Sequence, residues 1–212
     1  MVTIKEKVML KFAKIFFKRH RKDNEVCQPD NIVTDIKPDY PGPCAAFLSG
    51  KEADCGTIER FIDFSYDQLE NSHSYIQYAF PIKEPSMYNS KAPVLTDKEI
   101  DWIRSDAGIQ ARSNLESMFL RMINFYGFTY FLSPESVSLQ RSDFFDERSK
   151  VWLTPGNHNY KRLTRILKSL MLCGLEDDAR KLYKELEKTY ADYEDIIGAE
   201  SFEYWKNAVD AK

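Results

Sequence analysis

The sequence has few of the residues from which catalytic and metal sites are usually built. Its 212 residues include only three His, four Cys and eight Gly. There is no glycine-rich phosphate loop, no G-x-S-x-G nucleophile elbow and no His-x-x-x-His pair, so the motifs argue against a nucleotide-binding fold and a serine hydrolase. His73, His158 and Cys173 lack the close spacing of zinc ligands. We therefore expect no cofactor and no metal, and no motif identifies an enzyme.

Long apolar runs are also missing. The longest clean runs, such as residues 15–17, are a few residues long, whereas a membrane-spanning helix needs roughly 18. No A-x-A-like cleavage site follows the basic N-terminus, which argues against a secretory signal. Cys27, Cys44, Cys55 and Cys173 show neither C-x-x-C spacing nor the density of a disulfide scaffold. Reduced thiols in the cytoplasm are the simplest interpretation, and a Cys44–Cys55 bridge is the alternative.

What the chain does contain is the material for one folded domain with a short appendage. Hydrophobic residues make up 43%, charged residues 30% and aromatic residues 14%, which is enough for a sizeable core. The net charge of −3 conceals an asymmetry, because residues 1–22 carry eight Lys and Arg against one Glu and leave an acidic body. Since phosphate contacts need clustered cations, we expect no nucleic-acid partner for this body.

The N-terminal segment is set apart by its pattern. Residues 3–22 have apolar side chains at helical spacing with lysines largely off that stripe, which predicts a basic amphipathic helix over 1–22. Such a helix suits an anionic membrane surface or an acidic partner, or it docks on its own acidic domain. Residues 23–46 contain four prolines and form a linker or an extended strap.

From residue 47 onward, the apolar spacing is typical of helices. It predicts a helix over 57–70, a short helix before residue 92, one that opens with a Thr96–Glu99 capping box, and others over 107–125, 159–173, 174–190 and 199–210. Residues 129–156 lose this periodicity and predict a surface excursion, and no segment alternates long enough to predict a strand. The expected fold class is all-α: a single multi-helix domain with a C-terminal antiparallel helix hairpin.

The polar residues within these helices have both functional and structural interpretations. Lys161, Arg165 and Lys168 follow one side of the 159–173 helix and could bind an anion, or pair with the acids at 176–178. Asn157 and Asn159 are suited to cap the same helix. His73 and Gln77 lie four residues apart on a short helix, where a structural histidine is the more common case.

Two strings in the chain resemble a known family. Residues 70–82 read ENSHSYIQYAFPI, which is similar to the E-x-H-x-Y-I-Q-W-L-F-P-L signature of the opioid growth factor receptor conserved domain, with one extra residue before His73. Tyr78 and Ala79 replace the usual Trp and Leu. Residues 157–170, NHNYKRLTRILKSL, follow in the family's order. The resemblance covers about 47–209 and assigns 47–212 to such a helical domain, in a compact member similar to microbial relatives.

The resemblance implies an all-helical fold and, from vertebrate members, a receptor for the pentapeptide Met-enkephalin that associates with nuclear and membrane fractions. We expect a noncatalytic module that binds a peptide or protein segment, with Arg162 or Arg165 receiving a carboxylate. The expected ligand-binding residues are His73, Tyr75, Gln77, Asn157, His158, Arg162 and Arg165. The alternatives are an enzyme of unrecognised type with His73 or His158 as base, and a cytoplasmic protein held peripherally on membranes by residues 3–22.

Overall fold

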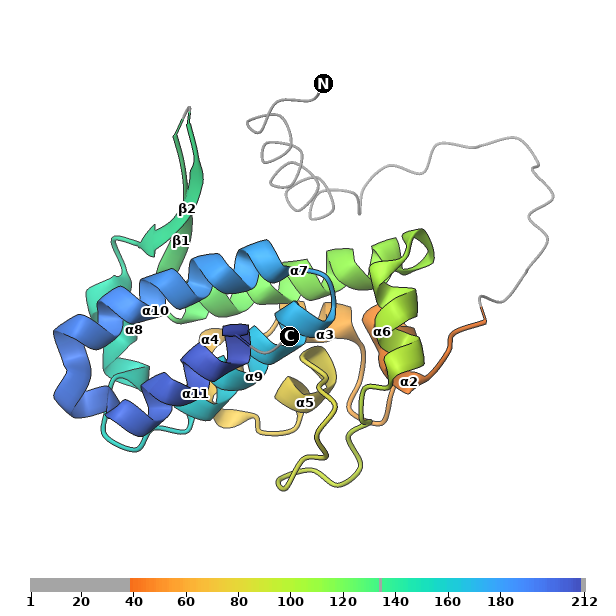
Figure 1. The fold of residues 1–212 in the computed structure, drawn as a ribbon. Helices are drawn as coiled ribbons and strands as arrows, with labels where there is room; N and C mark the ends of the chain where they lie inside the picture. The colour runs from red at the N-terminus through yellow and green to blue at the C-terminus, as the bar shows by residue number, and fades with distance from the viewer. Residues whose placement is uncertain (1–38, 134, 211–212) are drawn as a thin grey trace, which may run out of the picture. The chain divides into compact units, whose positions relative to one another are not determined.

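The computed structural model describes residues 39–133 and 135–210 (Figure 1). The predicted basic helix and all but the end of the proline-rich segment lie outside these residues. The described part of the chain contains ten α-helices and one β-hairpin, so the prediction of a helical fold class is confirmed. None of the helices it contains is long and apolar enough to cross a membrane.

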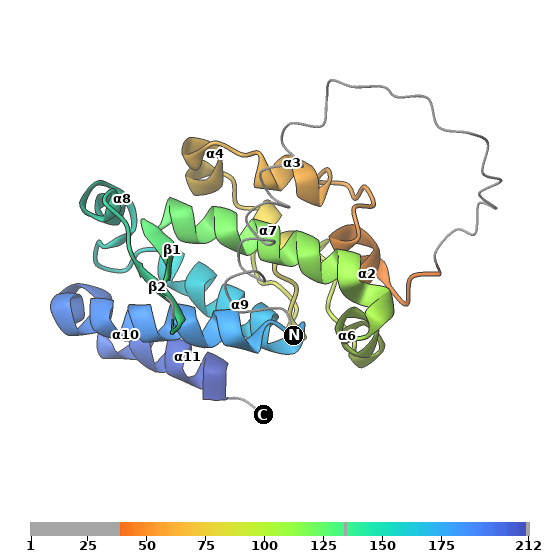
Figure 2. The same cartoon turned by 90° about the horizontal axis from the view of Figure 1, so that it is seen from above.

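The longest predicted core helix, α7 (Ile109–Phe125), has the first helices of the domain on one side (Figure 2). It packs against α2 (Pro43–Leu48) and α3 (Ile58–Ile62), and it is preceded by α6 (Asp97–Arg104) and a short 3-10 turn. The helix ends as predicted, with Gly127 in the left-handed region at φ 86°. A side chain at residue 127 would also lie 2.9 Å from the backbone of Phe145, so the close approach needs glycine.

The C-terminal helices lie on the other side of α7 (Figure 2). The predicted antiparallel hairpin is formed by α9 (Asn159–Leu172) and α10 (Glu176–Ile197), and α11 (Ala199–Asp210) packs against both. Trp205 of α11 is fully buried and donates a hydrogen bond from its indole Nε1 to the Tyr160 carbonyl at 3.0 Å. The position of α9 is therefore determined by apolar contacts and by a polar anchor.

Residues 129–156 differ from the prediction of an irregular excursion. They contain β1 (Phe128–Leu132) and β2 (Val137–Arg141), which pair as a hairpin, and α8 (Phe145–Trp152). No period-two pattern marks the strands because burial does not alternate along them, and Phe128 and Leu139 are their only fully buried side chains. The absence of strands was therefore predicted wrongly, and α8 was missed because its buried face rests on Phe145 and Trp152 at its two ends.

Two boundaries near the start of the domain also differ. The helical body begins at Pro43 in α2, four residues before the predicted start at residue 47. The predicted helix over 57–70 is two helices, α3 and α4 (Tyr66–Asn71), because Ser65 starts a new helix with a capping box to Gln68. Thr57 caps α3 as predicted, and the short helix before residue 92 is α5 (Tyr75–Ala79).

The predicted capping box at the start of α6 has a second role. The Glu99 carboxylate is fully buried, and its Oε2 accepts hydrogen bonds from Thr96 N and Oγ1 at 2.9 and 2.8 Å. Its Oε1 accepts from Cys44 N and Ala45 N of α2 at 2.8 and 3.2 Å. One carboxylate therefore caps two helices, and both gain from a negative charge at their N-termini. A side chain at Gly42 would overlap this carboxylate.

Replacing this carboxylate by an amide should destabilise the fold. In Glu99→Gln the nitrogen cannot accept a hydrogen bond, so buried N–H groups at one of the two helix starts lose their partner, at a cost of about 2–3 kcal/mol in the free energy of unfolding. Urea denaturation measures this change. The control Asp101→Asn alters an exposed carboxylate on the same helix and should cost less than about 0.5 kcal/mol. Equal stabilities for the two variants would contradict the double cap.

Candidate functional site

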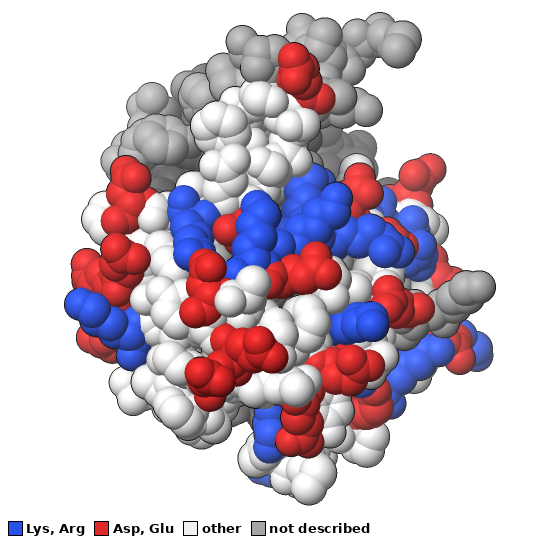
Figure 3. Space-filling model, turned by 60° about the vertical axis from the view of Figure 1, so that its left-hand side comes forward, with Lys and Arg blue, Asp and Glu red and all other residues white. Residues whose placement is uncertain are grey.

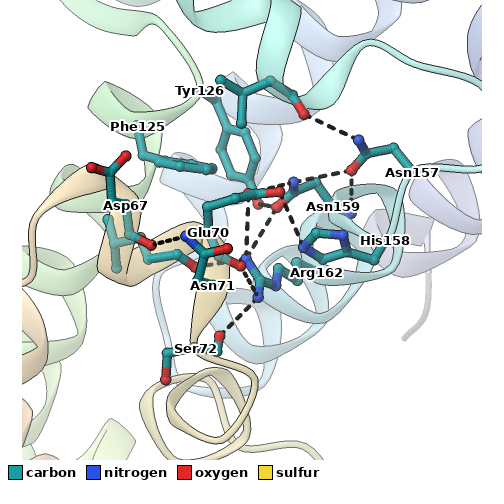
Figure 4. A network of polar contacts seen from close by, with 12 residues as sticks. Asp67, Glu70, Asn71, Ser72, Phe125, Tyr126, Asn157, His158, Asn159 and Arg162 are labelled. Atoms are coloured by element: carbon teal, nitrogen blue, oxygen red, sulfur yellow. Dashed lines mark hydrogen bonds and ion pairs between the residues drawn. The ribbon is translucent and has the colours of Figure 1, made fainter.

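The two signature strings meet at the side chain of Arg162 (Figure 4). Arg162 stands on the first turn of α9 with its side chain 6% exposed. Its guanidinium donates to the carbonyl oxygens of Leu69, Glu70 and Ser72 at 2.8, 3.2 and 2.9 Å. These carbonyls belong to the last turn of α4 and the residue that ends it, where a helix has no backbone donors of its own. A buried arginine of the second string therefore caps the start of the first.

Glu70 is the polar centre of this contact. Its Oε2 accepts a hydrogen bond from Asn159 Nδ2 at 3.0 Å and lies 3.9 Å from Arg162 Nη1, while its Oε1 lies 3.6 Å from His158 Nε2. The Glu70 side chain keeps 24% of its surface exposed. The carboxylate is thus oriented from within the protein by Asn159 and Arg162, and it remains accessible from the outside beside His158.

Asn157 and Asn159 support this centre in different ways. Asn157 Oδ1 accepts from the backbone N of Asn159 at 2.9 Å, which confirms the predicted capping role for the first asparagine. Asn159 is fully buried, and besides its bond to Glu70 its Oδ1 accepts from Tyr126 Oη and Arg162 Nη1, each at 3.3 Å. The capping interpretation of Asn159 is wrong, because its side chain points into the network.

The structure brings the two histidines of the prediction together. The rings of His73 and His158 are stacked, with centroids 5.5 Å apart and planes inclined by 28°. Both residues are exposed to solvent. Partial burial lowers the pKa of His158, and the positive charge of Arg162 lowers it further against the opposing effect of Glu70. At neutral pH the His158 imidazole is therefore uncharged beside a carboxylate.

Tyr75 and Gln77 lie beneath this surface. Tyr75 is fully buried, and its hydroxyl donates to the Leu69 carbonyl at 3.2 Å, while the Arg162 guanidinium lies 5.6 Å from its ring centre. Gln77 is 5% exposed, and the orientation of its amide that satisfies both polar atoms lets the nitrogen donate to the His73 carbonyl at 2.9 Å. Both side chains hold the segment that carries His73 and leave little of their own surface for a ligand.

Arg165 faces a different part of the protein. It donates from Nη1 to the Phe80 carbonyl at 3.1 Å, and burial lowers its pKa. On the same helix Lys168 pairs with Glu84 at 2.6 Å, and Lys161 contacts the Tyr88 hydroxyl at 3.1 Å. The predicted pairing of this basic stripe with the acids at 176–178 is wrong. Its lysines instead contact Glu84 and Tyr88, in the loop before α6. Glu176 instead pairs with Arg104.

Sequence reasoning did not select two members of the site, Glu70 and Asn159. Glu70 begins the first signature string three residues before His73, and that spacing was the one available signal. The hydrogen bond that joins Glu70 to Asn159 runs between the two strings, which local patterns do not reveal. The described residues contain no group of three His, Cys, Asp or Glu side chains placed to hold a metal ion. Chemically, the surface offers a carboxylate and two imidazoles for hydrogen bonding, ion pairing and ring stacking.

The depressed pKa of His158 predicts a pH dependence. Its imidazole should titrate below the ordinary value of 6.5 in an NMR titration, with His158→Gln used to assign the signal. Because the unfolded chain then binds more protons, this contribution to stability is complete above pH 6.5 and is lost as the pH falls through the window below it. The decrease in Tm from about pH 7.5 to about pH 5.5 should be smaller in His158→Gln than in the wild type. A pKa above 6.5 would contradict this account.

Comparison with known proteins agrees with the resemblance of the two strings. Residues 53–212 match the model of the opioid growth factor receptor conserved region. The opioid growth factor receptor of Rattus norvegicus is 39% identical over 112 residues, which are 53% of this chain and 18% of that protein. The human receptor is 39% identical over 113 residues, which are 53% of this chain and 16% of that protein.

A second type of relative also matches. The opioid growth factor receptor-like protein 1 of Xenopus tropicalis is 34% identical over 119 residues, which are 56% of this chain and 22% of that protein. The aligned part of this chain thus spans less than a quarter of the length of each of these relatives. No solved structure gives a significant match. Since the family model covers more than half of its residues, the chain belongs to the family defined by the opioid growth factor receptor conserved region.

Proposed function

We propose that this domain is a noncatalytic binding module that holds a peptide or protein segment at the surface formed by Glu70, His73, Asn157 and His158. The observation that carries the proposal is the stacking of two exposed imidazoles beside a carboxylate that is held from within. Polar groups that are fixed by buried partners and still reach solvent are preorganised for a ligand, because binding then costs little side-chain ordering.

The chemistry of this surface favours a segment with a free amino group and an aromatic side chain. Glu70 is oriented by Asn159 and Arg162, so an incoming ammonium would gain a charge-assisted hydrogen bond without rearranging the carboxylate. The exposed rings of His73 and His158 offer a flat surface for an aromatic side chain. A pentapeptide such as Met-enkephalin has both features.

The other residues of the predicted site would act by positioning Glu70, His73 and His158. Arg162 and Tyr75 position Glu70 and the segment after it, and Gln77 holds the backbone of His73. The guanidinium of Arg162 already donates its hydrogen bonds to backbone carbonyls. A ligand carboxylate would therefore have to bind Arg165 instead. The relatives support a receptor role through their name, opioid growth factor receptor, which describes proteins much longer than the matched region.

An enzyme that uses one of the histidines as a base is the second candidate. It requires that the two imidazoles approach one another, and the 5.5 Å between their centroids meets that requirement. A neutral His158 is also in the right protonation state for a base.

Peripheral membrane association and a cytoplasmic location stay predictions from the charge pattern of residues 3–22, outside the described residues.

Isothermal titration calorimetry of the full chain with Met-enkephalin and with a pooled set of short peptides tests the proposal. We expect saturable binding that weakens at least tenfold in Glu70→Gln, because the amide cannot neutralise an ammonium. The control Glu52→Gln changes an exposed carboxylate elsewhere and should bind as the wild type does. N-terminally acetylated peptide should lose the same tenfold factor on the wild-type protein, since it has no ammonium.

Two results would count against the binding module. Absence of binding for every peptide tested would refute the proposed peptide-binding function. Equal affinity of Glu70→Gln and wild type would show that the peptide does not bind at this surface. Mass spectrometry of the recovered peptide distinguishes the second candidate. A peptide that returns cleaved or modified, with the change abolished in His158→Gln, would establish the enzyme instead.

A further inference from the structure

Two arginines lie over one tyrosine ring on the surface beside the start of α4. The guanidinium carbon of Arg121 is 4.6 Å from the ring centre of Tyr66, and that of Arg148 is 4.3 Å from the same centre. The two positive charges therefore lie within about 9 Å of each other, since each is within cation–π distance of one ring. Arg121 comes from α7 and Arg148 from α8, so three separate helices build the cluster.

Both guanidiniums are held in place on their inner side. Arg121 Nε donates to the Phe64 carbonyl at 3.0 Å, and Arg148 Nε donates to the Phe125 carbonyl at 2.9 Å. Arg148 also lies over the Phe125 ring, at 5.1 Å from its centre. Arg121 Nη2 donates to the same Phe64 carbonyl, which leaves Nη1 of Arg121 and both terminal nitrogens of Arg148 for other partners. The two guanidiniums are thus fixed in position and keep N–H groups that can donate to a ligand.

Neither arginine has an acidic partner among the residues that the structure describes. Asp67, next to Tyr66 on α4, is exposed and forms no ion pair with either of them in that part of the chain. Arg104, Arg141 and Lys168, by contrast, all pair with a carboxylate. Two fixed like charges at this separation repel one another, and an anion that contacts both would outweigh that repulsion with two attractive interactions.

We propose that Arg121, Arg148 and the Tyr66 hydroxyl form a binding site for a phosphate group. A phosphate dianion matches the charge of two guanidiniums, whereas a carboxylate would neutralise only one. Arginine forks bind phosphate oxygens with paired, charge-assisted hydrogen bonds, and a phenol adds a neutral donor. The phosphate comes either as the free ion or as a monoester on a partner protein.

Basic and acidic side chains alternate on the surface of the domain. Figure 3 shows one face with a band of basic side chains and acidic ones on either side of it. Tyr66 also precedes Glu70 by one helical turn on α4, so the two sites share one side of that helix. A phosphorylated segment bound at the arginines could continue toward the histidine pair, although the phosphate site itself does not depend on that continuation.

The test is an NMR titration of the full chain with inorganic phosphate, observed at the arginine Nε–H signals. Sodium chloride at equal ionic strength is the reference, because it screens charge without offering oxygen acceptors. We expect the signals of Arg121 and Arg148 to shift together and to saturate below about 20 mM phosphate. The affinity should fall at least tenfold in Arg148→Gln and in Arg121→Gln, whereas Arg104→Gln, which loses an ion pair elsewhere, should leave it unchanged.

Linear shifts without saturation, or shifts that chloride reproduces, would overturn the site even if a variant fails to fold, because both are observed on the wild type. Unchanged affinity in both folded glutamine variants would overturn it as well. A second titration with a phosphoserine peptide and its unphosphorylated counterpart separates the two sources. Tighter binding of the phosphopeptide than of inorganic phosphate at the same two arginines identifies a protein partner, and preference for the free ion identifies phosphate itself.

Discussion

The buried guanidinium of Arg162 is the interaction on which the candidate site depends. A cation in the interior is costly unless its donors are satisfied, and Arg162 meets that condition with three backbone carbonyls and the side chain of Asn159. The carbonyls in turn gain hydrogen-bond donors, because the end of α4 offers them none from the backbone. The same contact joins segments about ninety residues apart in the chain and thereby places Glu70 beside His158.

Glu99 provides the complementary constraint at the other end of the domain. Its buried carboxylate satisfies the first N–H groups of α2 and α6, as the buried guanidinium satisfies the last carbonyls of α4. In both cases a charged side chain supplies the hydrogen bonds that short helices cannot make internally. The helices α2 to α6 have only five to eight residues each. Long-range caps therefore compensate for the limited length of these elements.

The helices could be predicted wherever a stripe of apolar residues was long enough to show its period, as in α7, α9, α10 and α11. The hairpin and α8 could not, because their burial rests on a few aromatic residues such as Phe128 and Trp152 instead of a repeating pattern.

In the site, the signature strings indicated His73, His158 and Arg162, and the structure brings these residues together. Glu70 was not selected and Asn159 was interpreted only as a cap, because the hydrogen bond that joins them runs between the two strings. Arg165 was placed with them because it belongs to the second signature string, yet it bonds to Phe80.

The histidine pair depends on the Arg162 anchor, and nuclear Overhauser measurements between the two imidazoles test that dependence directly. At neutral pH the stacked rings, with centroids 5.5 Å apart, should give cross-peaks between His73 and His158 in the wild type. Arg162→Lys keeps the charge and loses the planar fork, so it should abolish the cross-peaks while the core signals of α10 and α11 persist. The matched change Arg180→Lys, on an exposed position of α10, should leave them intact. Cross-peaks that survive in Arg162→Lys, or are missing in the wild type, would contradict the account.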